Sequence, residues 1–433
     1  MIDIRLIREN PAGVKAAIAT LHADAPIDDI LAADSSRRTI VNDVERLKAQ
    51  RNEGSKRVSQ IRDAKERQLL VDQMRQLGDE ISSLDNQLRH IDEHLHQLML
   101  LVPNLPANDV PVGASEDENV VVREIGEKRE FGFPVIPHWD LAERLGIIDF
   151  ERGVKVSGSR FYILRGDGAR LQRALIAWMI DYHTQKHGYQ EVYPPYLVME
   201  EMLVGTGNLP KFRETLFRDI SEDKWLIPTA EVPVTNLYRD EILDEAMLPI
   251  YHVAYTACFR REQVSGGKDV RGIKRGYQFD KVEMVKLVHP DRSAEEHERL
   301  ISEVTDVLEA LELPYRLLQM CTGDLSFTAA SKFDLEVWAP GSEEWLEVSS
   351  CSSFRDFQAR RANLRFRPAG GGKPLFLHTL NGSGLALPRT MIAIMENYQR
   401  ADGTFTIPQV LRPYLGNQEV IGIQPPFGPA KPN

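Results

Sequence analysis

Two arginines and four glutamates in the second half of the chain are the residues whose types could do chemistry together. They are Arg260, Arg389, Glu231, Glu262, Glu283 and Glu347. An arginine can bind a phosphate through two parallel hydrogen bonds and stays charged, while carboxylates bind Mg²⁺ or an ammonium group. The set could therefore hold a nucleotide triphosphate, its metal ion and an amino-acid substrate. Any one carboxylate alone is more often a solvated or salt-bridged residue, so this interpretation depends on the joint pattern.

Other common catalytic motifs are missing from the sequence. There is no Gly-x-x-x-x-Gly-Lys-Ser/Thr loop, no Gly-x-Gly-x-x-Gly after an expected strand and no Gly-x-Ser-x-Gly elbow. Cys258, Cys321 and Cys351 are widely spaced, which favours free buried thiols over a disulfide framework or a zinc site.

The stretch Tyr255–Leu287 must position several of these residues. Aromatic and β-branched residues at both ends, with turn formers between them, predict two antiparallel strands joined by a long loop. The loop carries Lys268, Arg271, Lys274 and Arg275, which suits a polyanion such as nucleotide phosphates or RNA. A charged surface hairpin that blunts a sheet edge is the simpler alternative.

The first hundred residues predict a long helical hairpin. One unbroken heptad seam consists of Met74, Leu77, Ile81, Leu84, Leu88, Ile91, Leu95 and Leu98. A weaker seam precedes it, with a turn expected between Asp63 and Gln68. Two antiparallel helices of about 35 residues would each reach about 50 Å. Such an arm either binds a large ligand or serves as an oligomerisation or spacer element. Before it, Ile2–Leu21 predicts a capping region with one helix.

Prolines between Leu101 and Gly113 end the hairpin and mark a linker. We expect two domains, 1–108 and 109–433. In the second domain, strands in antiparallel hairpins with helices inserted between them predict an α+β sheet. One of these helices is expected to begin with a capping box formed by Ser293 and Glu296.

Composition indicates a soluble globular protein, because 42% of the 433 residues are hydrophobic and 27% are charged. The sequence has no run of 18 apolar residues, so no membrane span is predicted, and the cytoplasm is the expected location. The formal net charge of -11 argues against indiscriminate nucleic-acid binding but allows a specific RNA partner.

Several long segments, in the right order, resemble class II aminoacyl-tRNA synthetases, and the similarity to the seryl-tRNA synthetase family runs nearly from end to end. The segments are Thr229–Asn236, Cys258–Arg260, Gln278–Met284, Glu347–Ser352, Asp356–Arg361 and His378–Ala386, followed by Arg389. The resemblance implies an antiparallel catalytic sheet flanked by helices, and a tRNA-binding function for the N-terminal coiled-coil arm. Three features depart from the usual family pattern: Leu387-Pro388 before Arg389, whose effect stays open, Arg261, and the loop start Gln263–Lys268.

The resemblance also implies an activity: ATP-dependent activation of L-serine and transfer of serine to tRNA(Ser), with tRNA(Sec) left open as a second substrate. It assigns catalytic roles to Arg260, Arg389 and Glu347, and Mg²⁺ to Glu347 with Ser350. The implied ATP contacts are Arg260, Arg261, Glu262, Gly276, Tyr277, Gln278, Phe279, Glu347, Val348, Ser349, Ser350 and Arg389. The implied serine contacts are Thr229, Ala230, Glu231, Arg260, Glu283 and Ser383.

The implied partners include a second copy of the chain, because Tyr189–Val198 is similar to the dimer-forming motif of the family. The loop at 263–275 would meet the acceptor end of the tRNA. Two alternatives remain at this point: an amino acid:carrier-protein ligase, and a catalytically silent RNA-binding paralogue. The heptad seam argues against the first alternative, and the presence of Arg260, Glu347 and Arg389 argues against the second.

Overall fold

The computed structural model describes residues 1–262 and 271–425. It contains two compact units, Met1–Pro103 and Asn104–Asn433. The division falls slightly earlier in the proline-containing linker than the boundary expected near residue 108. In the described ranges, no helix combines the length and apolar character needed to span a bilayer.

The N-terminal unit begins with two short helices where one was predicted. Helix α1 spans Ile4–Glu9 and α2 spans Pro11–Thr20. The side chain of Asn10 accepts a hydrogen bond from the Gly13 amide at 3.0 Å and so caps α2. Pro11 then occupies the first turn, where its missing N–H is tolerated. Together they start a new helix instead of continuing the first.

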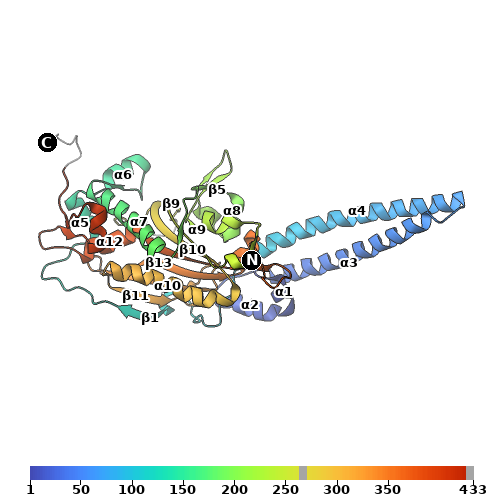
Figure 1. The fold of residues 1–433 in the computed structure, drawn as a ribbon, viewed down its shortest axis with the longest axis horizontal. Coiled ribbons are helices and arrows are strands. Elements are labelled where there is room, and N and C mark those ends of the chain that lie inside the picture. The colour runs from blue at the N-terminus through green and yellow to red at the C-terminus, as the bar shows by residue number, and fades with distance from the viewer. Residues whose placement is uncertain (263–270, 426–433) are drawn as a thin grey trace. The chain divides into compact units, whose positions relative to one another are not determined.

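The predicted helical hairpin is present as α3, Ile27–Val58, and α4, Ala64–Leu100, which lie side by side (Figure 1). All eight heptad residues of α4 are buried or half-buried, as a coiled-coil seam requires. The connecting turn comes earlier than predicted, because the Asp63 side chain accepts hydrogen bonds from the Lys65 and Glu66 amides and caps α4 there. The residues after Asp63, where the turn was predicted, therefore form the first turn of α4.

Gly54 stands at a position in the weaker seam of α3 where an apolar side chain would be expected. It is buried, and a Cβ atom at this position would lie 2.2 Å from Sδ of Met74 on α4. The glycine thus makes room for a large side chain on the facing helix. Gly78 of α4 differs, since no atom lies within 4 Å of its Cβ position.

The C-terminal unit is built on a sheet of eight strands within the described residues. Their order in the sheet is β1 (Val120–Ile125), β11 (Tyr315–Gln319), β12 (Ser331–Ala339), β13 (Glu344–Arg355), β16 (His378–Ala386), β10 (Gln278–Val288), β9 (Ile250–Phe259) and β4 (Gln190–Glu191). Neighbouring strands pair antiparallel except β4 and β9, which pair parallel at the edge. The α+β prediction is confirmed.

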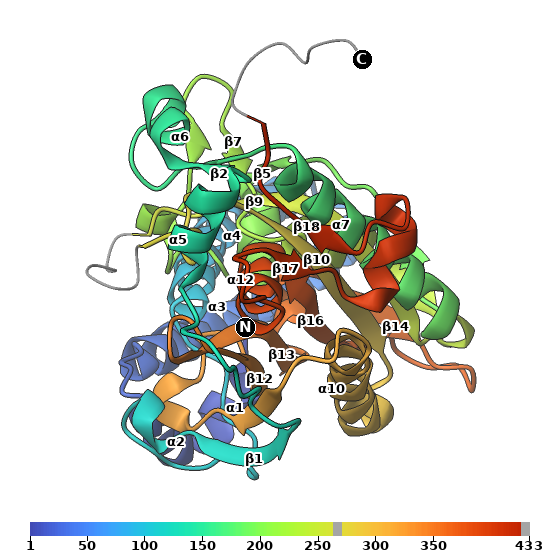
Figure 2. The same ribbon diagram turned by 90° about the vertical axis from the view of Figure 1, so that its left-hand side faces the viewer.

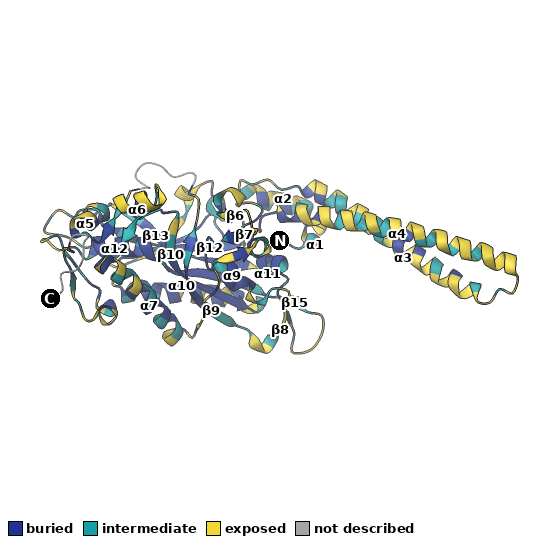
Figure 3. Ribbon diagram, turned by 90° about the horizontal axis from the view of Figure 1, so that it is seen from above, coloured by how far each residue is buried: buried dark blue, intermediate teal, exposed yellow. Residues whose placement is uncertain are grey.

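One face of this sheet is covered by α7 (Asp167–Lys186), α10 (Ser293–Ala310) and α12 (Leu387–Asn397) (Figure 2). Apolar side chains of these helices and of the strands form the main core, which includes Trp178, Val304 and Ile394. Figure 3 shows the buried residues concentrated in the sheet and its covering helices, whereas α3 and α4 are largely exposed. On the other face of the sheet, a second core cluster that includes Val285 and Leu287 covers part of the strands, and the remainder lines a cavity.

Helix α10 does not begin with the predicted capping box. Ser293 is its first residue, and Arg292 is the cap residue without a side-chain cap bond. The Glu296 carboxylate is instead buried and bonded to the fully buried ammonium of Lys286 at 3.1 Å. A buried cation needs such a partner, so tertiary contacts outweigh the local signal.

Candidate active site

The β9–β10 hairpin supplies one wall of the cavity. Phe279, Lys281 and Glu283 alternate along β10 and line the cavity with their side chains, as the two-residue period of a strand requires. Arg260 follows the last residue of β9, and its amide donates to the Tyr277 carbonyl at 3.0 Å, which closes the base of the hairpin. The predicted strands are therefore confirmed. Residues 263–270 of the loop lie outside the described residues.

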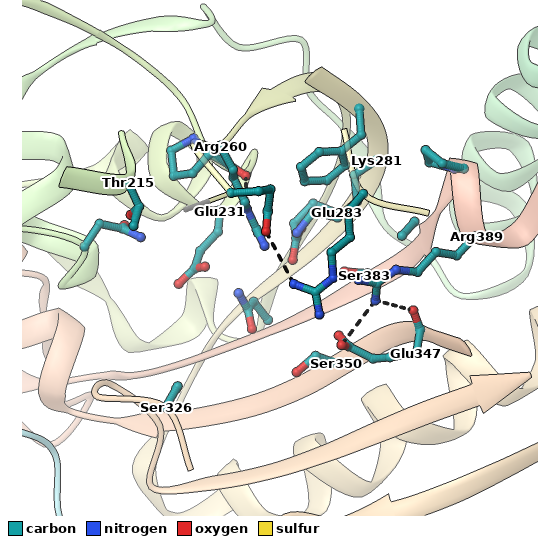
Figure 4. A pocket seen from close by; sticks show the side chains of 18 of the residues that line it. Thr215, Glu231, Arg260, Lys281, Glu283, Ser326, Glu347, Ser350, Ser383 and Arg389 are labelled. Atoms are coloured by element: carbon teal, nitrogen blue, oxygen red, sulfur yellow. Dashed lines mark hydrogen bonds and ion pairs between the residues drawn. The ribbon is translucent and has the colours of Figure 1, made fainter. Parts of the chain in front are cut away.

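The opposite wall comes from β13, β16 and α12. It contributes Glu347 and Ser350 from β13, Ser383 from β16 and Arg389 from the first turn of α12. Pro388 is the second residue of that helix, in the first turn, where its fixed φ angle fits. The cavity has a volume of about 770 Å³, and Figure 4 shows Arg260, Glu283, Glu347 and Arg389 around it.

Arg389 and Glu347 are held together at this cavity. Nη1 of Arg389 donates to the backbone carbonyl of Glu347 at 2.6 Å and to its Oε2 at 3.2 Å. Partial burial raises the pKa of the Glu347 carboxyl, but the charges of Arg389 and Lys332 outweigh this effect, and the pKa lies below its usual range. Glu347 is therefore ionised and able to hold a cation near neutral pH.

Arg260 is oriented by backbone and ring contacts. Its Nε donates to the Pro228 carbonyl at 3.1 Å, and its guanidinium lies 5.2 Å from the centre of the Phe279 ring. Nearby, Glu262 pairs with Arg275 at 3.4 Å. A guanidinium, an aromatic face and a carboxylate thus occur on one side of the cavity, which suits a phosphate and a base with an exocyclic amino group.

Glu231 and Glu283 form an acidic corner with different partners. The Thr229 hydroxyl donates to Oε2 of Glu283 at 2.9 Å, and Lys281 forms an ion pair with the same carboxylate. Glu231 accepts a bond of 2.6 Å from Nε2 of Gln358. Burial, followed by the charge of Glu283, raises the pKa of Glu231 to about 7.

Most of the predicted site residues come together at this cavity. Those that line it are Arg260, Arg261, Glu262, Gly276, Phe279, Glu347, Val348, Ser350, Arg389, Glu231, Glu283 and Ser383. Thr229 lies just behind Glu283, and Ser349 donates from its Oγ to the Ser383 carbonyl at 2.7 Å. Ala230 is fully buried in a core cluster.

Tyr277 and Gln278 are predicted ATP contacts that do not line this cavity. Tyr277 packs edge-on against Phe161 and Phe217. Gln278 is exposed and lines a separate cavity with Asp280. Their predicted ATP contacts stay predictions.

Several polar residues that belong to the site were not assigned from the sequence. Lys281, Lys332 and Asn381 line the cavity, and Gln358 bonds to Glu231. Lys281 could have been found, because it lies two residues before Glu283 on the same strand face. Lys332 and Gln358 reach the site only through pairing and packing of distant segments.

Glu347 and Ser350 fit the requirements of Mg²⁺. Both offer oxygen atoms to the cavity, and Mg²⁺ usually takes one or two carboxylates together with substrate phosphates and water. Across the described ranges, no group of three or more His, Cys, Asp and Glu side chains could hold a metal ion. The donors present thus suit an ion shared with a nucleotide better than a closed structural metal site.

The antiparallel sheet, the two arginines and the acidic corner define a class II aminoacyl-tRNA synthetase. Residues 212–398 match the family described as "tRNA synthetase class II core domain (G, H, P, S and T)", and residues 1–106 match the "Seryl-tRNA synthetase N-terminal domain". The chain belongs to the seryl-tRNA synthetase family.

Individual relatives agree with this assignment. A serine--tRNA ligase of Thermomicrobium roseum is 66% identical over 99% of this chain and 96% of its own length. One of Chloroflexus aurantiacus is 58% identical over 98% of this chain and 100% of its own. The crystal structure of seryl-tRNA synthetase from Pyrococcus horikoshii complexed with ATP matches with a TM-score of 0.92 and 36% identity, covering 98% of this chain and 100% of that one.

Proposed function

We propose that this chain activates L-serine with ATP and then transfers serine to the 3′ end of tRNA(Ser). The observation that carries the proposal is that Arg260, Glu283, Glu347 and Arg389 line one cavity. These residues are up to 129 positions apart in the sequence, as the numbering shows. Two cationic groups and two acids around one space match a triphosphate, its metal ion and a small amino acid.

In the activation step, the serine carboxylate attacks the α-phosphorus of ATP. The new bond joins the serine carboxylate oxygen to phosphorus, the bond to the bridging oxygen breaks, and pyrophosphate leaves. No protein nucleophile is needed, because the carboxylate is already ionised. Arg260 binds the α-phosphate and Arg389 the γ-phosphate, so that catalysis consists of positioning and charge neutralisation. Glu347 and Ser350 would hold a Mg²⁺ ion, which would supply positive charge to neutralise the phosphates.

The adenine would lie against Phe279, with its amino group donating to Glu262. Arg260 already lies over the same ring, so the phosphate end and the base end of the nucleotide share one strand. The remaining predicted ATP contacts are Arg261, Gly276, Tyr277, Gln278, Val348 and Ser349. Those that do not line the cavity would act through the backbone or through their neighbours.

The serine pocket would use Glu231, Glu283 and Ser383, with Thr229 and Ala230 behind them. A small pocket recognises serine by pairing its ammonium and its hydroxyl with polar groups. Such a pocket rejects alanine strongly, because alanine leaves polar groups of the protein unpaired. Threonine must be rejected by the limited space.

The transfer step joins the serine carbonyl to the terminal ribose hydroxyl of the tRNA and releases AMP. We propose that α3 and α4 bind tRNA(Ser), read by shape and backbone contacts. A homodimer formed through Tyr189–Val198 and activity towards tRNA(Sec) are further parts of the proposal. The three cysteines of the chain are free and buried, which agrees with a cytoplasmic location.

Serine-dependent exchange of pyrophosphate into ATP tests the activation step. We expect exchange with serine and at least 100-fold weaker exchange with alanine, glycine and threonine. Arg260→Gln should abolish it. Arg316→Gln is a matched control, because Arg316 pairs with Glu336 outside the cavity. Exchange that is absent, or that does not depend on serine, would refute the proposed function.

A further inference from the structure

Gln358 forms a closed set of hydrogen bonds behind the acidic corner. It belongs to α11, Phe357–Ala362, and is completely buried. Its Nε2 donates to Oε1 of Glu231 at 2.6 Å and to the Thr206 carbonyl at 3.1 Å. Its Oε1 accepts from the Thr379 hydroxyl at 2.6 Å. Both hydrogens of Nε2 and the carbonyl oxygen of the amide are therefore in use.

The partners of Gln358 fix which way its amide faces. The Thr206 carbonyl can only accept a hydrogen bond, so the amide nitrogen must face it. The amide oxygen then faces Thr379, whose hydroxyl is also completely buried. Glu231 consequently meets an N–H donor, and a donor favours the ionised form of a carboxyl. Turning the amide over would place its oxygen against two acceptors, the Thr206 carbonyl and the Glu231 carboxylate.

The two acids of the corner are unequal as a result. The carboxylate of Glu283 already has Lys281 as a charge partner. Glu231 faces Glu283, Lys281 and Arg260 at longer range, and its carboxylate accepts the Gln358 hydrogen bond at Oε1. Within residues 1–262 and 271–425, its Oε2 has no hydrogen-bond partner, and Glu231 lines the cavity. One carboxylate oxygen is thus held from behind while the other is available to a ligand.

We propose that Gln358 is a positioning residue of the amino-acid site, which holds Glu231 so that the free oxygen receives the ammonium group of the substrate. The inference rests on the proposed function and extends it to a residue that does not touch serine. The electrostatics agree with it. Burial and Glu283 oppose the charge of Glu231, and Gln358, Lys281 and Arg260 support it.

The variant Gln358→Met tests this role, because methionine has a similar volume but no donor. The readout is serine-dependent exchange, with KM measured separately for serine and ATP. We expect KM for serine to rise at least tenfold, while KM for ATP and the melting temperature change little. The pH at which kcat/KM for serine reaches half its maximum should also move upwards, because Glu231 loses a bond to its ionised form.

Gln172→Met is the matched control. Gln172 also donates to a carboxylate on β10, that of Asp280 at 2.8 Å, but it lines a different cavity. We expect its KM for serine to stay within twofold of wild type. Thr379→Val is a second variant, which leaves Gln358 in place but removes the donor to its Oε1, and it should weaken serine binding in the same selective way.

The outcomes separate this inference from the function on which it rests. Equal rises in KM for serine and ATP, or an unchanged KM for serine, would overturn the inference alone. Loss of cooperative melting in both Gln358→Met and Thr379→Val would show that Gln358 only fills the core, and would overturn it as well. Absence of serine-dependent exchange in the wild type would overturn the proposed function and the inference together.

Discussion

Replacing Glu347 by glutamine removes one negative charge from the cavity with almost no change in shape. The effect on stability should be small. The Glu347 and Arg389 side chains are 44% and 20% exposed, and an ion pair open to solvent contributes at most about 1 kcal/mol. Arg389 also keeps its 2.6 Å bond to the Glu347 backbone carbonyl, so that the arginine stays in place when the carboxylate is lost.

The effect on activity should be large for the same substitution. Glu347 is the charged member of the proposed Mg²⁺ pair, and a neutral amide is a poor replacement for a carboxylate on a hard cation. Removal of one preorganised charge-stabilising group costs about 3 kcal/mol in the transition state, or about 10²-fold in rate. We therefore expect Glu347→Gln to retain its melting temperature within a few degrees and to lose about two orders of magnitude in kcat.

Serine-dependent pyrophosphate exchange at a series of Mg²⁺ concentrations measures this effect. A part of the lost activity should return as Mg²⁺ is raised, because the variant binds the ion more weakly. Glu336→Gln is the control, since Glu336 lies opposite Glu347 on β12 but pairs with Arg316 away from the cavity. A Glu347→Gln variant with less than fivefold loss of kcat, or one that loses activity only through unfolding, would refute the assigned role.

Three further predictions concern other parts of the chain. Gly78→Ala should stabilise α4 by about 0.5–1 kcal/mol, because the Cβ position is open and alanine is the better helix former. Gly54→Val should destabilise the coiled coil by about 1–3 kcal/mol through a clash with Met74. Urea unfolding followed by circular dichroism compares the two variants, and the opposite order of stability would contradict this packing. The kcat/KM for serine should fall about tenfold from pH 8 to pH 6, because the pKa of Glu231 is about 7 and a protonated, neutral carboxyl binds an ammonium group poorly; a flat profile would exclude Glu231 as the ammonium ligand. A chain without residues 30–100 should retain serine-dependent exchange but lose charging of tRNA(Ser), and undiminished charging would remove the proposed role of the arm.

The features that the sequence predicts well are those with a local period. The heptad seam from Met74 to Leu98 identified α4, and aromatic and β-branched residues on both sides of a run of turn formers identified the β9–β10 hairpin. These patterns are reliable because a helix or a strand repeats its exposed and buried faces at a fixed spacing. The short helix α1 before Pro11 was not predicted, because only one helix was expected in Ile2–Leu21.

Features that depend on distant contacts were not predictable in this way. Ser293 and Glu296 have the spacing of a capping box, yet Glu296 bonds to the buried Lys286, which comes from another element. Lys332 lines the cavity from β12 without belonging to any of the recognised segments. Both cases show that tertiary burial decides where a charged side chain finds its partner.

Glu231 and Glu283 show that residue types alone do not predict the charge partner of each acid in the site. In the sequence they are two equivalent glutamates of the amino-acid site. In the fold, Lys281 shares the strand face of Glu283 and forms an ion pair with it, whereas Glu231 meets the neutral amide of Gln358. Two ionised acids side by side repel each other, and compensation of one by lysine leaves the other free to ionise when a substrate cation arrives. The site therefore presents one carboxylate already neutralised by the protein and one that the amino acid itself can neutralise.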